Sequence, residues 1–95
     1  MGGMAKVEFR SAAVAQAYNV LCDQDEAIED ALEWLRERLG DDPRRVRSRD
    51  YSVPGQGVAQ MSTAGLSGKD GHVTIVWRLE ASSVVIYGVL FDPLG

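Results

Sequence analysis

The sequence predicts an α+β fold, in which two N-terminal helices pack on an antiparallel sheet in the order β-α-α-β-β-β. Two helical stretches follow one short alternating segment, and two long runs rich in β-branched and aromatic residues lie near the C-terminus. A length of 95 residues leaves room for one domain, residues 1–95, and not for two cores. The leading "MGGM", residues 1–4, is expected to be disordered or a cloning remnant.

The first segment, "KVEFR" at residues 6–10, alternates polar and apolar side chains and predicts a short strand. The next segment, "SAAVAQAYNVL", predicts a helix with Ser11 as its N-cap. Three apolar residues follow at helical spacing: Val14, Tyr18 and Leu21. No residue from Ala12 to Leu21 is charged, so we expect more than one face of this helix to be covered.

The second helix is expected to start at a capping box formed by Asp23 and Glu26. Its apolar stripe consists of Ile28, Leu32, Leu35 and Leu39. Gly40 is expected as the residue after the helix, and Pro43 prevents its continuation. The acidic residues of this helix are expected to form a solvated face.

Three strands are predicted in the C-terminal half: residues 57–64, 72–80 and 84–91. The turn "GLSGKDG" is not a phosphate loop, because Thr63 and Asp70 stand where that motif needs Gly and Ser or Thr. The short connection 81–83 predicts an antiparallel hairpin that pairs Leu79 with Val84.

Continued without interruption, this register pairs Ile75 with Gly88 and divides the hairpin into two faces. The face expected against the helices carries Val73, Ile75, Trp77, Leu79, Val84, Ile86 and Leu90. The other face carries Thr74, Val76, Arg78, Glu80, Val85, Tyr87, Val89 and Phe91. It is too apolar to stay bare, so the chain itself, a second copy or another partner should cover it. The expected partner-binding residues are Val76, Val85, Val89 and Phe91.

Charge is distributed unevenly along this chain, whose net charge is −4. Residues 23–42 hold nine acidic and two basic residues, whereas Arg44, Arg45, Arg47 and Arg49 follow directly. These four arginines are candidate anion-binding residues. They could balance the acidic helix or form a solvated loop, bind an acidic partner protein, or bind nucleic acid. The net charge disfavours a protein built mainly to neutralise phosphates.

Cysteine and histidine usage excludes some kinds of site. Cys22 is the single cysteine and His72 the single histidine, so neither an intrachain disulfide nor a Cys/His-rich zinc site is possible. We therefore expect no metal and no cofactor, and a reducing cytoplasm as the location. No apolar run is long enough for a membrane span, so no membrane partner is expected.

The element order resembles that of the RelE/ParE superfamily of toxin-antitoxin toxins. The likeness lies in the strand that enters an uncharged helix, in the break "ERLGDDPR", and in the closing meander "GHVTIVWRLEASSVVIYGVLF". The resemblance implies cleavage of messenger RNA on the ribosome, or poisoning of DNA gyrase. It also implies an antitoxin-like partner protein that neutralises the toxin.

Several functional residues of that family have no counterpart in this chain. Thr74 stands where an arginine is often found, and Asp92 and Pro93 stand where basic, His or Tyr residues are expected. The remaining catalytic candidates are Arg78 for charge stabilisation and Tyr87 or His72 for proton transfer. The alternative function is a non-catalytic protein-binding or self-associating domain on the same scaffold.

Overall fold

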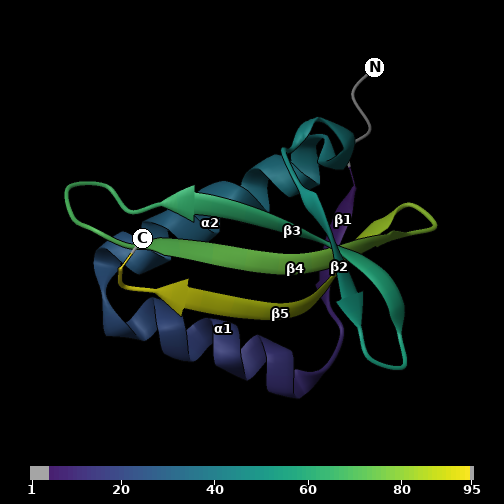
Figure 1. Cartoon of the computed structure of the whole chain (residues 1–95), viewed down its shortest axis with the longest axis horizontal. Helices are drawn as coiled ribbons and strands as arrows, with labels where there is room; N and C mark the ends of the chain where they lie inside the picture. Colours follow the sequence, from purple (N-terminus) through teal and green to yellow (C-terminus); the bar gives the residue numbers. More distant parts are fainter. Residues whose placement is uncertain (1–4, 95) are drawn as a thin grey trace.

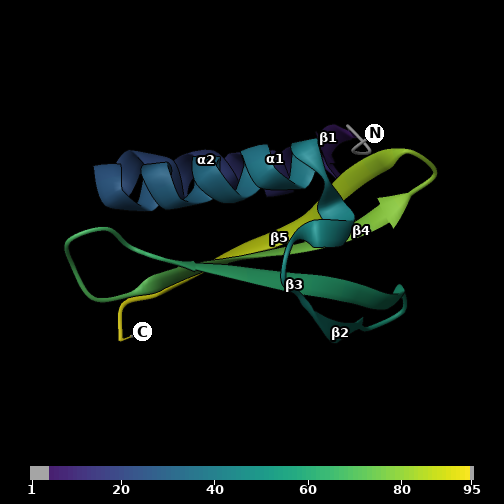
Figure 2. The same cartoon turned by 90° about the horizontal axis from the view of Figure 1, so that it is seen from above.

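A computed structural model describes residues 5–94 of the chain as a five-stranded sheet covered on one face by two helices (Figures 1 and 2). The elements in chain order are β1 (Lys6–Phe9), α1 (Ala12–Gln24), α2 (Glu26–Asp41), the 3₁₀ turn η1 (Pro43–Arg45), β2 (Arg49–Val53), β3 (Gly57–Gly65), β4 (His72–Glu80) and β5 (Ser83–Asp92). The predicted α+β class, with both helices near the N-terminus, is confirmed. The prediction that residues 1–4 are disordered or a cloning remnant concerns residues outside the described range.

The sheet contains one strand that the sequence did not predict, and it is mixed and not purely antiparallel. Its strand order is β1-β5-β4-β3-β2. The new strand, β2, comes from the arginine-rich stretch and pairs antiparallel with β3, from Arg49 opposite Met61 to Val53 opposite Gly57. The first strand, β1, runs parallel to β5, and the long stretch of chain between them supplies the crossover connection that a parallel pair needs.

Each helix begins at a side-chain cap. The Ser11 hydroxyl accepts the Val14 N–H at 3.3 Å, as predicted for α1. For α2 the cap is Asp25 and not Asp23, since a carboxylate oxygen of Asp25 accepts the Ala27 N–H at 2.8 Å. The predicted capping box of Asp23 and Glu26 is wrong, because α1 extends through Asp23 to Gln24 and Glu26 is the first residue of α2.

Gly40 lies inside α2 and does not follow it, so its predicted role as the terminating residue is wrong. The Gly40 carbonyl accepts the Ala5 N–H at 2.7 Å. A Cβ atom at position 40 would come within 3.4 Å of Val7 Cγ2. Gly40 therefore holds the N-terminal segment against α2 through its backbone carbonyl, at a point where a Cβ atom would reach the short end of van der Waals contact.

The core lies between the helices and the sheet. Its fully buried members from α2 are Leu32, Leu35 and Leu39, with Ile28 and Ala31 nearly as deep. The sheet contributes Val73, Ile75, Trp77, Val84 and Ile86. The Trp77 indole N–H donates to the Ser62 hydroxyl at 3.0 Å, which satisfies both buried groups. These positions agree with the predicted apolar stripe of α2. They also agree with the side of β4, and of β5 up to Ile86, that was predicted to face the helices.

A β-bulge at Tyr87 corrects the predicted face of the second half of β5. Trp77 pairs with Ile86, but its neighbour Val76 pairs with Gly88, so β5 contains one extra residue. Each later β5 side chain consequently changes face. Val89 and Phe91 pack against the core on the helix side, whereas Leu90 lies on the open side and is 57% exposed.

Neither helix of the described residues is long and apolar enough to cross a membrane.

Candidate functional site on the open sheet face

We call the side of the sheet that faces away from the helices the open face. Strand β2 curls over part of it (Figures 1 and 2). On this face Val76 and Thr74 are only 6% and 8% exposed. The chain itself therefore covers part of the surface that the sequence left uncovered, and Val76 is too buried to be a partner-binding residue. Of the four predicted partner-binding residues, Val85 alone is half-buried on this face.

The open face holds a group of polar side chains, the Tyr87 cluster, consisting of Arg10, Arg78, Glu80 and Tyr87. The guanidinium carbons of Arg10 and Arg78 lie 5.1 and 5.9 Å from the centre of the Tyr87 ring. The Tyr87 hydroxyl donates a hydrogen bond to Glu80. Two cations, an aromatic ring and a carboxylate are therefore held together at the β4–β5 end of the sheet, beside the end of β1.

Arg78 also ties this cluster to the β2–β3 turn. Its Nη1 donates to the Gln56 carbonyl at 2.6 Å, and its Nε lies 4.0 Å from Glu80 Oε2. The side chain remains about one-third exposed. Arg78 thus has a structural role in the hairpin in addition to any role toward a ligand.

The contact with Glu80 makes the Tyr87 hydroxyl hold its proton more firmly. The hydrogen bond to Glu80, together with a smaller contribution from burial, raises the pKa of the Tyr87 hydroxyl. Like any tyrosine the hydroxyl is protonated at neutral pH, and the shift favours its role as a hydrogen-bond donor to Glu80. The pair offers one group that can give a proton and one carboxylate that can accept one.

His72 does not join this cluster, although the sequence placed it in the same catalytic set. It begins β4, six residues before Arg78, and a strand of that length separates the two by about 20 Å. His72 Nε2 instead lies 4.0 Å from Asp92 Oδ2 at the opposite end of the hairpin. The structure therefore unites Arg78 and Tyr87 but excludes His72 from their chemistry.

The four arginines of residues 44–49 do not form a single site. Arg45 lies within η1, where its Nε is 3.4 Å from Asp42 Oδ2. Arg47 and Arg49 line a hollow of about 340 Å³ together with Ser48, Met61 and Thr63. Arg44 lines a separate hollow beside Trp77 and Leu79. Of these arginines, Arg45 alone pairs with the acidic segment among the described residues, so balancing that helix is not their common role.

Sequence reasoning missed Arg10 and did not assign a proton-transfer role to Glu80. The signal for Glu80 was available, because residues two apart on a strand share a face, as Arg78 and Glu80 do. Arg10 could not be found in this way, because β1 is far from β5 in the chain. It lies beside Tyr87 only through the parallel pairing that places Phe9 opposite Ile86.

No metal centre forms within residues 5–94, where no three His, Cys, Asp or Glu side chains converge as ligands. Cys22 is a free thiol, half-buried in α1. Burial, and then the negative charges of Glu29 and Glu33, raise the pKa of its thiol. It is therefore protonated at neutral pH and poorly suited to nucleophilic chemistry.

Comparison with family models, with curated proteins and with solved structures gives no match to this chain.

Proposed function

We propose that this chain is a RelE/ParE-like toxin-scaffold protein that acts on messenger RNA at its open face. The observation that carries the proposal is the Tyr87 cluster, in which two guanidinium groups lie over an aromatic ring whose hydroxyl donates a hydrogen bond to a carboxylate. The element order of the scaffold, with an N-terminal strand, two helices and a closing meander, supports the same assignment.

The cluster combines the groups that single-stranded RNA needs for binding. Arginine pairs with phosphate oxygens, and its guanidinium plane can also stack on an unpaired base. Arg49 and Tyr51 lie on the same face of β2, where Tyr51 is 43% exposed, and extend the binding surface. The acidic residues of α2 belong to the other layer of the molecule, so they oppose a bound polyanion less than the net charge suggests.

The same groups fit the chemistry of RNA cleavage. The 2′-oxygen forms a bond to phosphorus while the bond from phosphorus to the 5′-oxygen breaks. In this proposal Glu80 accepts the 2′-hydroxyl proton and the protonated Tyr87 supplies a proton to the departing 5′-oxygen; their mutual hydrogen bond supports the pairing of these roles. Arg10 and Arg78 would stabilise the charge that develops on the phosphoryl oxygens.

The test is induction of the chain in a bacterial host, followed by measurement of growth and transcript integrity in the first minutes. We expect growth arrest with cut transcripts. Arg10→Ala and Glu80→Gln should abolish the cutting. Arg38→Ala is the matched control, because Arg38 lies over the Trp34 ring on α2 and away from the open face. Intact transcripts in an arrested host would overturn RNA as the target.

Arg78→Ala is a less direct variant, because it also removes the hydrogen bond to the Gln56 carbonyl. Its thermal unfolding must be measured beside its activity. An inactive Arg78→Ala protein that unfolds at the wild-type temperature would support a direct role in RNA binding.

A second candidate function is a non-catalytic protein-binding domain, held by an antitoxin-like protein or by a second copy. The engagement of Arg78 by Gln56 and Glu80 favours it, because those donors are already used within the chain. Healthy growth on induction, together with loss of a complex in Tyr87→Glu, would support this function over the first.

A further inference from the structure

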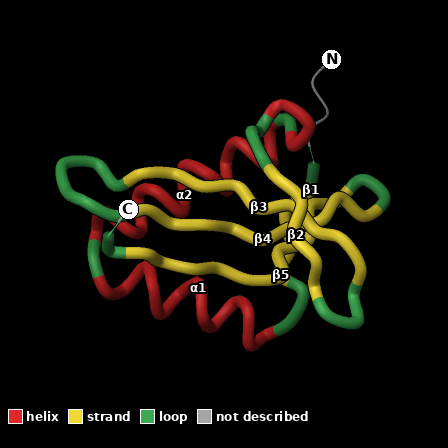
Figure 3. The backbone as a smooth tube through the Cα atoms, viewed as in Figure 1, coloured by secondary structure: helices red, strands yellow, loops and turns green. Residues whose placement is uncertain are grey.

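The second half of β5 is an open edge of the sheet. Strand β1 pairs only with Ser83–Ile86, and no strand of the described chain lies beside residues 87–92 on that side (Figure 3). Unpaired N–H and C=O groups at such an edge can accept another strand. The bulge at Tyr87 and the proline at position 93 bound the regular part of this edge to Gly88–Asp92.

An apolar groove runs between this edge and α1. Its volume is about 570 Å³, and its lining contains no charged residue: Ala13, Gln16, Ala17, Val20, Leu21, Val89, Leu90 and Phe91. Val20 and Leu90, one from each side, are 51% and 57% exposed. Two large apolar side chains are thus left in solvent beside unpaired backbone.

The solvent-facing side of α1 is unusual for an exposed helix. Tyr18 is its single buried residue, and six of the residues between Ala12 and Val20 are exposed, yet none is charged. The sequence predicted that more than one face of α1 would be covered, but no other part of the described chain covers this exposed side. A solvated helix normally carries charge on its exposed side, as α2 does.

The absence of charge selects the kind of partner. In a two-fold interface each residue meets the same surface of the other copy, so like charges would face each other. Two copies of a chain with net charge −4 repel, and an uncharged surface is where they can approach at the lowest cost. The other open edge, at the end of β3, has Asp30 in its groove and does not meet this condition.

We propose that a second copy of this chain binds at the β5 edge, with the two β5 strands antiparallel around a two-fold axis and the two α1 helices adjacent. Centring the axis on Leu90 places Leu90 opposite its equivalent and Asp92 opposite Gly88, so no carboxylates face each other. Val89 and Phe91 then join their equivalents on the helix side of a sheet that continues through both copies. The interface leaves the Tyr87 cluster on the open face and is independent of the proposed function.

Sedimentation of the full chain across the micromolar range tests the proposal, with the expected species at twice the mass of one chain. Leu90→Lys and Val20→Glu should each weaken association at least tenfold, because each buries a charge without a partner. Val58→Lys is the matched control, since Val58 is 54% exposed on β3, away from the groove. Unfolding curves of all three variants establish that the monomers remain folded.

Cross-linking tests the register. In a Cys22→Ser background, Leu90→Cys should form an intermolecular disulfide faster than Leu94→Cys, although Leu94 is 90% exposed. A wild-type chain that remains monomeric throughout the concentration range would overturn the proposal. A dimer that persists in Leu90→Lys and in Val20→Glu, or that cross-links equally through either cysteine, would also overturn it.

Discussion

The two helices lie on the same face of the sheet, yet they are anchored and charged in different ways. α2 buries five apolar residues, whereas α1 buries only Tyr18. The exposed side of α2 is acidic, whereas α1 has no charge from Ala12 to Cys22. One helix therefore organises the core of a single chain, and the other offers an apolar side that the single chain leaves exposed.

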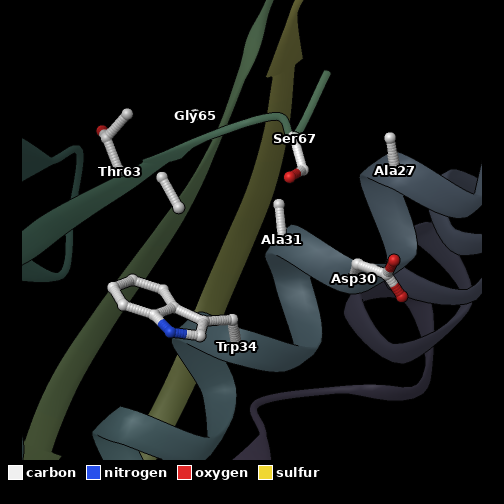
Figure 4. A pocket seen from close by; sticks show the side chains of 8 residues that line it. Ala27, Asp30, Ala31, Trp34, Thr63, Gly65 and Ser67 are labelled. Carbon is white, nitrogen blue, oxygen red and sulfur yellow. The ribbon is translucent and has the colours of Figure 1, made fainter. Parts of the chain in front are cut away.

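The same contrast extends to the two open edges of the sheet. Beside β3, Trp34 and Asp30 of α2 line a hollow of about 560 Å³ with Thr63, Ser67 and neighbouring small residues (Figure 4). The Trp34 ring is half exposed, and the Arg38 guanidinium lies 4.8 Å from its centre. Beside β5, the corresponding groove has no charge. Charge therefore makes the edge at β3 costly for self-association and leaves the edge at β5 permissive.

The largest change in unfolding free energy should come from truncating a buried side chain of α2. Leu35 is 1% exposed, so Leu35→Ala should cost about 2–5 kcal/mol of unfolding free energy. Val20→Ala on α1 should change it by less than about 0.5 kcal/mol in the monomer, because Val20 is half exposed. Urea unfolding at dilute protein measures both. Equal losses would show that the two helices contribute alike to the core.

Removal of the hydroxyl group of Tyr18, the buried residue of α1, should stabilise the fold and not destabilise it. The Tyr18 hydroxyl is buried and has no hydrogen-bond partner within residues 5–94. Tyr18→Phe should therefore stabilise the fold by about 1 kcal/mol, since it removes an unsatisfied polar group. A destabilised variant in the same urea assay would mean that the hydroxyl has a partner in solution.

Tyr18 should also make stability depend on alkaline pH. Burial raises its pKa from 10.0 to about 12, although the nearby Arg36 guanidinium opposes this shift in part as a hydrogen-bond donor and as a charge, without reaching hydrogen-bond geometry in the folded chain. The folded state keeps the proton that the unfolded state releases, so stability is complete below pH 10 and falls as the pH rises toward 12. Tyr87, whose pKa is also raised, contributes in the same direction. The decline should be shallower in Tyr18→Phe than in the wild type.

Removing charge from the acidic helix should make the two edges more alike. The variant Asp30→Asn should associate several-fold more readily than the wild type, because Asp30 is the charged residue that lines the groove at the β3 edge. Light scattering against protein concentration measures this, with Glu8→Gln on β1 as a control of equal kind. Unchanged association would indicate that charge does not protect the β3 edge.

The smallest effect concerns the N-terminal cap of α2. The hydrogen bond from Lys69 and then the Ala27 N–H lower the pKa of Asp25. A carboxyl group with a depressed pKa stabilises the fold above its unfolded value of 3.8, and this contribution is lost as the pH falls through the folded value. Lys69→Met should flatten this acid dependence slightly in thermal unfolding. The Lys69–Asp25 pair is largely exposed, so its contribution to stability should be small. A steep loss of acid dependence in Lys69→Met would show that the pair contributes more than an exposed ion pair does.

Local pattern was sufficient for the parts of the fold that depend on neighbours in the chain. The apolar stripe of α2, the Ser11 cap and the pairing of Leu79 with Val84 follow from helical spacing, cap chemistry and a short connection. Strand β2 was harder to recognise, because RDYSV is largely exposed and has little apolar alternation. It becomes a strand by pairing with β3, which is a tertiary contact.

For the candidate site, the sequence determined that Arg78, Glu80 and Tyr87 belong to one hairpin. Only the tertiary structure decided which residues meet there. Because of the bulge at Tyr87, Val89, Leu90 and Phe91 each lie on the face opposite to the one that the sequence predicted. Side chains alternate between the two faces of a strand, so one extra residue exchanges the faces of all the residues that follow it. Parallel pairing of β1 brought Arg10 to Tyr87 from a distant part of the chain. Spacing along the chain fixes which residues share an element, whereas the register between elements decides which of them act together.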